Sequence, residues 1–397
     1  MNIVQIRHCD EAADVLRKIG VDPYGISAMT PKTRHLNLLV RHQPCRIANI
    51  LKQELLSLGG DAAVARGAVS CSIETTDILM MGTAKQLAAL ADKLDCQPFG
   101  LRNLGYEIRD VLCNYEKKDF IFKTARRKIS LSEKTFIMGI LNVTPDSFSD
   151  GNQFYDRQKA IDRGLQMADE GADILDIGGE STRPGATAVR AADEIKRVIP
   201  VIEGLARKTK LPISIDTTKA KVARAALQAG AEIVNDISAL HGDKKMISVV
   251  QEEDAALILM HMRGNPRNMQ TGDLHYDELM PDIIDYLKKA CQSAVSGGIQ
   301  KECLVLDPGI GFGKTAEDNF KIIKSLADLK CLGFPLMIGT SRKSFIGKAT
   351  GEKAEDRIDG TGATVTAAIL NGCSIVRVHD VAAMKKVVAV ADAIVHA

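Results

Sequence analysis

Several features that would place a chain in a common class are missing from this sequence of 397 residues. Its nine cysteines contain no C-x-x-C pair, and no apolar run reaches the length of a membrane span. Lysine and arginine form no extended run, and the net charge is only +2. These absences argue against nucleic acid and membrane as partners and predict reduced thiols. Because residues 1–10 also lack the apolar core of a signal peptide, we expect a soluble cytoplasmic protein.

A length of 397 residues and a change of composition predict two domains. The segment Tyr115 to Lys134 is rich in lysine and arginine and has little apolar periodicity, so we place a boundary after residue 118. Residues 1–118 combine strand and helix patterns and predict a smaller α+β domain. No catalytic constellation occurs in it, and its role is left open between assembly, regulation and stability. Its predicted elements are strands Leu36–Val40 and Asp77–Met81 and helices Asp10–Ile19, Ile47–Leu58, Ala84–Leu94 and Leu104–Cys113.

Residues 119–397 form the second predicted domain, and from about residue 137 to the end they repeat one pattern eight times: a short apolar run, a polar or glycine-rich cluster and a helical stretch. Eight such units favour a closed (β/α)8 TIM barrel over an open doubly wound sheet, and in such barrels the carboxyl ends of the strands converge on one pocket. Two further short runs, Phe120–Phe122 and Lys128–Leu131, predict a hairpin that closes the bottom of the barrel. The predicted barrel strands are Ile137–Leu141, Ile174–Ile177, Ile213–Asp216, Glu232–Asn235, Leu257–Met260, Leu304–Asp307, Leu336–Ile338 and Ile375–Val378.

Charged and amide side chains end several of these apolar strands. Asp216 and Asp307 each close one, and a carboxylate aimed into a barrel is costly unless it is paired or used. Each could accept two parallel hydrogen bonds from the N–H groups of a guanidine-like ring edge. Asn235 offers both a donor and an acceptor, and Lys343 could donate to a ring carbonyl. One such acid could equally cap a helix or pair with an arginine, but four polar strand ends together favour a ring-binding site.

A second group of residues suits an anion. Arg377 and His379 lie two apart on the last strand and therefore face the same side, where barrels often bind phosphate. Asn142 ends the first strand with a neutral oxygen, which suits magnesium held mainly by phosphate oxygens and water. His379 could instead be a packed core imidazole. His261 and Met260 fit the lining of the pocket better than catalysis.

Two loops are rich in glycine, proline, serine and threonine, namely 142–151 (NVTPDSFSDG) and 178–185 (GGESTRPG). Loops of this kind commonly close over substrates. Three other motifs fail on spacing. The segment 309–315 misses a phosphate-binding loop by one residue, and neither Ser181 nor Ser341 has the glycine that closes a nucleophile elbow.

Several sequence motifs of this chain together resemble those of the dihydropteroate synthase family. The match runs in order through nearly the whole second domain and leaves residues 1–118 outside it as an extension. The matching phrases are MGILNVTPDSFSDG (138–151), DIGGESTRPGA (176–186), ISIDT (213–217), NDIS (235–238), MHMRG (260–264), LDPGIGFGKT (306–315), GTSRKSFIG (339–347) and RVHDV (377–381).

The resemblance implies that 6-hydroxymethyl-7,8-dihydropterin diphosphate condenses with 4-aminobenzoate, with Mg²⁺ as cofactor, in a homodimer that sulfonamides inhibit. It also implies a role for individual residues. The catalytic set would be Asp216, Asp307, Lys343, Arg377 and His379. Pterin would be held by Asp216, Asn235, Asp307, Lys343 and Met260, and diphosphate by Asn142, Thr182, Arg377 and His379, with magnesium on Asn142. The aminobenzoate site would comprise Thr182, Arg183, Pro184, Phe312 and Ser344.

Two alternatives compete with this function. A methyltetrahydrofolate–corrinoid methyltransferase shares a pterin-binding barrel, but no diphosphate leaves in its reaction, so GGESTRPG and the Arg377–His379 pair would not be expected. A non-catalytic pterin-binding protein would not need the intact set of charged strand ends. Both features therefore favour the synthase.

Overall fold

The computed structural model describes the whole chain except residues 7, 145–152, 182–184, 186–187, 265–268 and 271–273. The chain divides into two compact units, Met1–Lys117 and Lys118–Ala397. The division falls one residue before the expected boundary, so Lys118 belongs to the second unit. Each unit has a hydrophobic core of its own.

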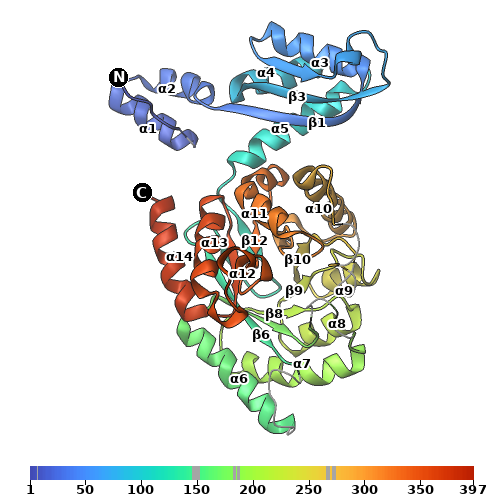
Figure 1. Cartoon of the computed structure of the whole chain (residues 1–397), viewed down its shortest axis with the longest axis vertical. Helices are drawn as coiled ribbons and strands as arrows, with labels where there is room; N and C mark the ends of the chain where they lie inside the picture. The colour runs from blue at the N-terminus through green and yellow to red at the C-terminus, as the bar shows by residue number, and fades with distance from the viewer. Residues whose placement is uncertain (7, 145–152, 182–184, 186–187, 265–268, 271–273) are drawn as a thin grey trace. The chain divides into compact units, whose positions relative to one another are not determined.

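The first unit is a three-stranded antiparallel sheet of order β1-β3-β2 with helices packed on it, which agrees with the predicted α+β class (Figure 1). Ile78 and Met80 alternate with exposed neighbours along β3 and pack against buried leucines of the helices. The sequence prediction missed the four-residue strand β2. The elements are α1 (Cys9–Ile19), α2 (Pro23–Met29), η1 (Thr30–Lys32), β1 (His35–Pro44), α3 (Cys45–Ser57), β2 (Asp61–Val64), η2 (Arg66–Ala68), β3 (Thr75–Thr83), α4 (Ala84–Leu94) and α5 (Leu101–Glu116).

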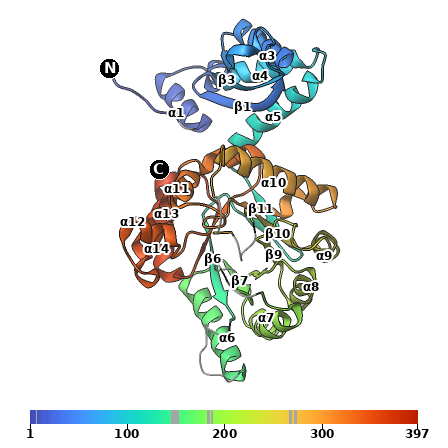
Figure 2. The same ribbon diagram turned by 45° about the vertical axis from the view of Figure 1, so that its right-hand side comes forward.

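The second unit is the expected (β/α)8 barrel. Its eight parallel strands run in the order β11-β10-β9-β8-β7-β6-β13-β12. Figure 2 labels the neighbouring strands β9, β10 and β11 of this barrel. A single parallel bridge between Leu306 and Leu336 joins the two ends of the order. The barrel strands are β6 (Phe136–Asn142), β7 (Ile174–Gly178), β8 (Ile213–Asp216), β9 (Ile233–Asp236), β10 (Ala256–Met260), β11 (Leu304–Asp307), β12 (Met337–Ile338) and β13 (Ile375–Val378).

Helices surround these strands (Figure 1). No helix among the described residues is both long and apolar enough to cross a membrane. The α-helices are α6 (Gln153–Glu170), α7 (Ala191–Ala206), α8 (Ala220–Ala229), α9 (Met246–Glu252), α10 (Leu279–Ser296), α11 (Ala316–Lys324), α12 (Ser344–Thr350), α13 (Ile358–Leu370) and α14 (Val381–Val395). Shorter turns are η4 (Lys301–Cys303), η5 (Leu326–Leu332) and η6 (Ala354–Asp356).

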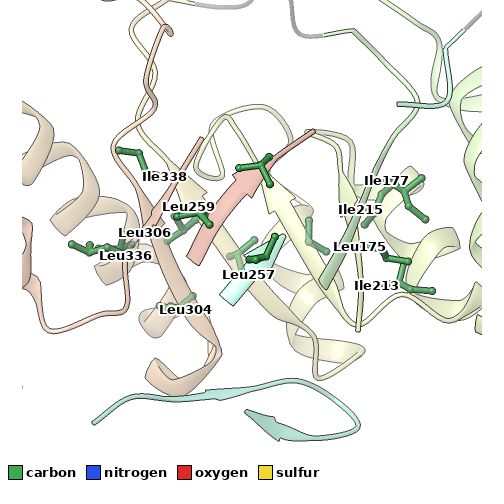
Figure 3. Packing of buried hydrophobic residues seen from close by; sticks show 14 of the residues in the cluster. Leu175, Ile177, Ile213, Ile215, Leu257, Leu259, Leu304, Leu306, Leu336 and Ile338 are labelled. Atoms are coloured by element: carbon green, nitrogen blue, oxygen red, sulfur yellow. The ribbon is translucent and has the colours of Figure 1, made fainter. Parts of the chain in front are cut away.

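Side chains alternate between two faces along each barrel strand, because successive residues of a strand point to opposite sides. One set packs against the helices; Leu175 and Ile177 of β7 and Ile213 and Ile215 of β8 belong to it (Figure 3). The other set points into the barrel. Its lower members are apolar and form one cluster with the hairpin described next, whereas its upper members at the carboxyl ends are mostly polar.

A hairpin closes the bottom of the barrel, as the sequence predicted. It consists of β4 (Ile121–Lys123) and β5 (Lys128–Ser130), which pair antiparallel below the strands (Figure 3, teal ribbon). Phe122 is fully buried in the same cluster as the inward residues of the barrel strands. Arg127 Nε and Thr124 Oγ1 donate to buried Glu232 over 2.9 and 2.7 Å. The hairpin therefore belongs to the core of the barrel.

Phe122→Ala should lower the free energy of unfolding of the barrel by about 3–5 kcal/mol, because it removes a fully buried aromatic ring. The adjacent Ile121 is 47% exposed on the opposite face of the same strand, so Ile121→Ala is the matched control and should cost less than about 1 kcal/mol. Urea denaturation of both variants would measure the difference. Equal losses would show that the hairpin is not part of the core.

Candidate active site

Inward-facing polar side chains from five strands meet at the carboxyl ends of the barrel. They are Asp176 on β7, Asp216 on β8, Asn235 on β9, Asp307 on β11 and Arg377 on β13. All the acids and the amide are at most 9% exposed. Asp176, Asn235, Asp307 and Arg377 each lie two positions after an apolar residue of the lower barrel, whereas Asp216 lies two positions after buried Ser214. The period of the strands therefore points all five side chains into the barrel.

Arg377 pairs with two carboxylates in this layer. Its Nε donates to Asp176 Oδ2 over 2.6 Å and its Nη2 to Asp216 Oδ2 over 2.7 Å. Asn235 Nδ2 also donates to Asp176 Oδ2, over 3.1 Å. The four side chains form one hydrogen-bonded network that joins strands β7, β8, β9 and β13 across the inside of the barrel.

Two buried acceptors in this network have no partner within the described part of the chain. They are Asp176 Oδ1 and Asn235 Oδ1. Buried polar groups are normally hydrogen-bonded, and an unpaired acceptor costs about 1–3 kcal/mol. The two oxygens therefore mark a site that suits a ligand carrying N–H donors.

Burial, with smaller contributions from the nearby carboxylates Asp176 and Glu194, raises the pKa of Asp216 to about 7. The Arg377 guanidinium opposes this shift without overcoming it. Asp307 is also buried, and burial raises its pKa, although the Gly309 N–H donates to its Oδ1 over 2.6 Å. Both acids thus have a weakened preference for the ionised form, which a cationic or donor-rich ligand would restore.

Lys343 lies beside the loop that follows β11. Its Nζ sits 4.3 Å from the centre of the Phe312 ring, and burial lowers its pKa to about 8, as does the charge of Arg377. Phe312 belongs to a small apolar cluster with Ile237, Met260 and Met262. The predicted pterin and aminobenzoate residues Lys343, Phe312 and Met260 therefore lie at the same end of the barrel as the acids.

Lys314 is buried beneath this loop. Its Nζ lies 2.9 Å from His261 Nδ1 and donates to the carbonyls of Gly309 and Phe312 over 2.9 and 3.1 Å. Burial lowers the pKa of Lys314 to about 7 and that of His261 well below its usual value. Lys314, which belongs to the motif with the wrong spacing for a phosphate-binding loop, thus holds the loop between Asp307 and Phe312 in place through the carbonyls of Gly309 and Phe312.

His379 is held by Ser341. The His379 N–H donates to Ser341 Oγ over 3.2 Å, and that Oγ lies 3.0 Å from His379 Nδ1. If the hydroxyl donates to Nδ1, the imidazole keeps its proton on Nε2. Burial and the charges of Arg377 and Arg342 lower the pKa of His379 to about 4, so the ring is neutral at pH 7.

Asn142 is exposed at the end of β6, next to Gly178 of β7. A side chain at Gly178 would begin 3.6 Å from Asn142 Oδ1 and 3.9 Å from Asp216 Oδ2. The glycine leaves the space between these two oxygens open. The described residues contain no group of three His, Cys, Asp or Glu side chains able to hold a metal. A metal here would therefore depend on Asn142 and on oxygens of a ligand and water, a donor set of the kind that Mg²⁺ accepts, and Mg²⁺ at this site stays a prediction.

The structure brings together most, but not all, of the site residues predicted from sequence. Ser344 is exposed at the first residue of α12, directly after Lys343. Thr182, Arg183 and Pro184 lie outside the described residues. The expected separation between a ring-holding and an anion-holding set is not sharp, because Arg377 is bonded to Asp216.

The sequence analysis assigned no role to Asp176. It lies in the middle of the run ILDIG, two positions before the end of β7. Its signal was the same as that of Asp216: a carboxylate inside an apolar strand, at the parity that points into the barrel.

Comparisons with known proteins show what the second unit is similar to. A family model described as a pterin binding enzyme matches residues 138–379. A dihydropteroate synthase of Synechocystis sp. is 49% identical over 263 residues, which are 66% of this chain and 91% of that protein. The solved structure of dihydropteroate synthase from Xanthomonas albilineans in complex with 7,8-dihydropteroate matches with a TM-score of 0.63 and 39% identity, covering 70% of this chain and 99% of that one.

A third relative also matches the first unit. A probable bifunctional folylpolyglutamate synthase/dihydropteroate synthase of Halobacterium salinarum is 40% identical over 392 residues, which are 97% of this chain and 46% of that protein. A match of this extent includes most of residues 1–117, whereas the Synechocystis match is no longer than the barrel unit.

The fold and the polar strand ends define a pterin-binding barrel enzyme. More narrowly, the chain belongs to the dihydropteroate synthase family and is a transferase. The corrinoid methyltransferase and the non-catalytic binding protein are thereby set aside.

Asp216→Asn should raise the melting temperature of the barrel more at pH 8 than at pH 5. Because burial raises the pKa of Asp216 to about 7 from an unfolded value of about 3.9, the folded chain binds more protons than the unfolded chain between these values. Stability is therefore lost as pH rises through this window and levels off above pH 7. The neutral amide removes that loss.

Differential scanning calorimetry at the two pH values would measure this effect. The control is Asp119→Asn, at an exposed carboxylate of the same unit, which should change the melting temperature equally at both. A gain for Asp216→Asn that is no larger at pH 8 would contradict the inferred cost of ionising this acid.

Proposed function

We propose that this chain joins 6-hydroxymethyl-7,8-dihydropterin diphosphate to 4-aminobenzoate and releases 7,8-dihydropteroate and diphosphate, a step of folate synthesis. The observation that carries the proposal is the layer of buried Asp176, Asp216, Asn235, Asp307 and Arg377 at the carboxyl ends of the strands. Such a layer suits a flat ring with several N–H donors attached to an anionic leaving group. Membership of the synthase family supports this choice.

The pterin ring would take its hydrogen bonds from this layer. Its guanidine-like edge offers N–H donors to Asp216 and Asp307, and Asn235 Oδ1 is a buried acceptor that lacks a partner in the described chain. Lys343 would donate to the ring carbonyl. Burial raises the pKa of Asp216 because it removes the water that would solvate the ionised carboxylate. The N–H donors of the ring would replace that water and so favour the ionised form.

Diphosphate departure would rely on Arg377 and His379. The bonds of Arg377 to Asp176 and Asp216 use Nε and Nη2, so Nη1 is its donor toward the diphosphate. His379 would donate from Nε2 as a neutral imidazole. Asn142 and the diphosphate oxygens would hold Mg²⁺, which when bound neutralises charge on the leaving group. Thr182 would add a hydroxyl to this site.

The reaction follows from these contacts. The bond between the pterin methylene carbon and the diphosphate oxygen breaks, and its electron pair leaves with diphosphate. The resulting cation is delocalised into the ring, where the carboxylates of Asp216 and Asp307 stabilise it. The amine of 4-aminobenzoate then donates its lone pair to the methylene carbon and loses a proton to solvent. No strong base is needed, because the arylamine is only weakly basic.

The second substrate would bind above the pterin. Phe312 forms an apolar wall beside Lys343, and Ser344 follows it at the start of α12. Thr182, Arg183 and Pro184 would complete this site from the loop after β7. Aminobenzoate would therefore bind after the pterin diphosphate, and sulfonamides would compete with it.

We further propose that the protein acts as a homodimer in the cytoplasm. The dimer rests on resemblance to the family. The location is supported by the nine cysteines, all of which are free thiols.

Purified protein with Mg²⁺, pterin diphosphate and labelled 4-aminobenzoate should form dihydropteroate. Asp216→Asn and Arg377→Ala should each lower kcat/KM by about a hundredfold or more, since each removes a charge that faces the reacting atoms. Asp119→Asn is the control and should retain full activity.

Near-ultraviolet circular dichroism would establish that the variants are folded. Absence of product from folded wild-type protein would refute the proposed function. Near-normal rates in one variant would remove the role proposed for that residue alone.

Asn142→Ala should raise the Mg²⁺ concentration needed for half-maximal rate by about tenfold, because it removes the protein oxygen proposed to contact the ion. The matched control is Asn103→Ala, at an exposed asparagine of α5. Titration of activity with Mg²⁺ at saturating substrates would measure this. An unchanged Mg²⁺ requirement would show that Asn142 does not hold the metal.

A further inference from the structure

Lys314 is a buried cation to which the proposed reaction assigns no role. It lies in the loop between β11 and α11, and it is only 2% exposed. Its Nζ lies 2.9 Å from His261 Nδ1 and donates to the carbonyls of Gly309 and Phe312 over 2.9 and 3.1 Å. An ammonium has three N–H donors and no acceptor, so His261 Nδ1 accepts the third hydrogen bond. Within the described chain these contacts use all the donors that Lys314 could offer to a phosphate.

The three acceptors around this ammonium come from the loops that follow β10 and β11. His261 is the first residue after β10, and its backbone N–H donates to the Asp307 carbonyl over 2.9 Å. Gly309 and Phe312 lie in the loop after β11, and the Gly309 N–H donates to Asp307 Oδ1 over 2.6 Å. A closed cycle of hydrogen bonds therefore runs beside the acid proposed to hold the pterin, through Lys314, Gly309, Asp307 and His261.

Glycines allow the loop after β11 to pack this closely on its neighbours. Gly309 has a φ of +70°, and a side chain there would begin 1.9 Å from the His261 carbonyl oxygen. Gly313 has a φ of +65°, and a side chain there would begin 2.5 Å from the Arg263 carbonyl oxygen. Both positions therefore require glycine. The loop lies directly against the residues that follow β10, with Lys314 beneath it.

The same loop also forms part of the apolar wall of the candidate site. Phe312 accepts from Lys314 through its carbonyl, while its ring lies 4.3 Å from Lys343 Nζ. A side chain at Gly311 would begin 3.4 Å from Lys343 Cδ, so the loop backbone packs against that lysine as well. Asn319 of α11 holds the other side of the loop, because its Oδ1 accepts from the Gly311 N–H over 2.7 Å. These contacts keep the Phe312 ring in place against Lys343.

Lys314 also acts on Asp307 through its charge. Burial raises the pKa of Asp307, and groups from three neighbouring segments lower it, namely the Gly309 N–H and the charges of Lys343, Arg377 and Lys314. The Cys373 thiol faces the same acid and is neutral, because burial raises its pKa to about 12. Lys314 is itself charged below its pKa, which burial lowers to about 7. Loss of Lys314 removes one of these charges and releases the Gly309 peptide, so it would raise the pKa of Asp307 further.

We propose that Lys314 is a positioning residue for the pterin site. It holds the loop after β11 from beneath, so that the Gly309 N–H stays on Asp307 Oδ1 and fixes that carboxylate. The same hold keeps the Phe312 ring beside Lys343. This role rests on the proposed function for the identity of the ligand, whereas the cycle of hydrogen bonds does not. It gives the lysine of the segment 309–315 a task within the loop rather than on a phosphate.

Lys314→Met keeps the length of the side chain and removes the ammonium. Titration calorimetry of the pterin diphosphate without aminobenzoate measures binding without turnover. At pH 8 this variant should bind about tenfold more weakly than the wild type, since small displacements of positioning groups are costly. At pH 6 the loss should reach about thirtyfold or more, because more of Asp307 is neutral in the variant. Lys314→Gln keeps two N–H donors on a neutral side chain, so its loss at pH 8 should be smaller and should still grow at pH 6.

Two controls accompany these variants. Tyr276→Phe removes the hydrogen bond that the Tyr276 hydroxyl donates to the Gly313 carbonyl over 3.0 Å. It therefore loosens the same loop without breaking the cycle around Asp307. Lys324→Met removes an exposed cation of α11. Each control should stay within about twofold of the wild-type affinity at both pH values.

Hydrogen exchange of the ligand-free protein, followed by mass spectrometry, tests the loop without reference to the substrate. Residues 308–313 should be protected in the wild type and should exchange about tenfold faster or more in Lys314→Met. A loop that exchanges freely in the wild type would overturn the proposal whether or not the variants fold. So would affinity losses in Lys314→Met that are equal at pH 6 and pH 8. Normal pterin binding by wild-type protein that forms no dihydropteroate would instead refute the proposed reaction alone.

Discussion

Arg377 is the group on which the arrangement of the barrel mouth depends. It extends from β13 across the inside of the barrel to carboxylates on β7 and β8, and Asn235 joins the same network from β9. Removing the guanidinium would leave two buried carboxylates without a counter-ion, which is far costlier than losing a surface ion pair. The pairing therefore fixes the positions of the acids at that end of the barrel.

Without a ligand, several charged and polar groups in and around this layer lack favourable partners. Burial raises the pKa values of Asp216 and Asp307 and lowers those of Lys343 and Lys314, and buried oxygens of Asp176 and Asn235 lack partners within the described residues. The lower barrel, by contrast, is filled with apolar side chains down to Phe122 of the hairpin. The apolar lower barrel and the surrounding helices therefore stabilise the fold. The polar layer at the carboxyl ends of the strands is left to take its missing hydrogen-bond partners from a ligand.

The sequence predicted the barrel well because its signals repeat. Three strands, including β8 and β11, have the predicted bounds, and the hairpin lies where two short runs placed it. Asp216 was found because it ends a strand. Asp176 was missed because it lies within one, although its inward parity carried the same information. Other contacts could not be predicted, because they join strands and loops that are distant in the sequence and no local pattern contains them. They are the hydrogen bonds of Arg377 and the contact between Lys314 and His261.

The role of the first unit does not follow from the structure of the barrel. Its core is its own, and the match to the Synechocystis synthase is no longer than the barrel unit. The match to the Halobacterium protein, a probable bifunctional folylpolyglutamate synthase/dihydropteroate synthase, includes most of this unit. Since every residue assigned to the reaction lies in the barrel, its contribution has to be sought in assembly, regulation or stability.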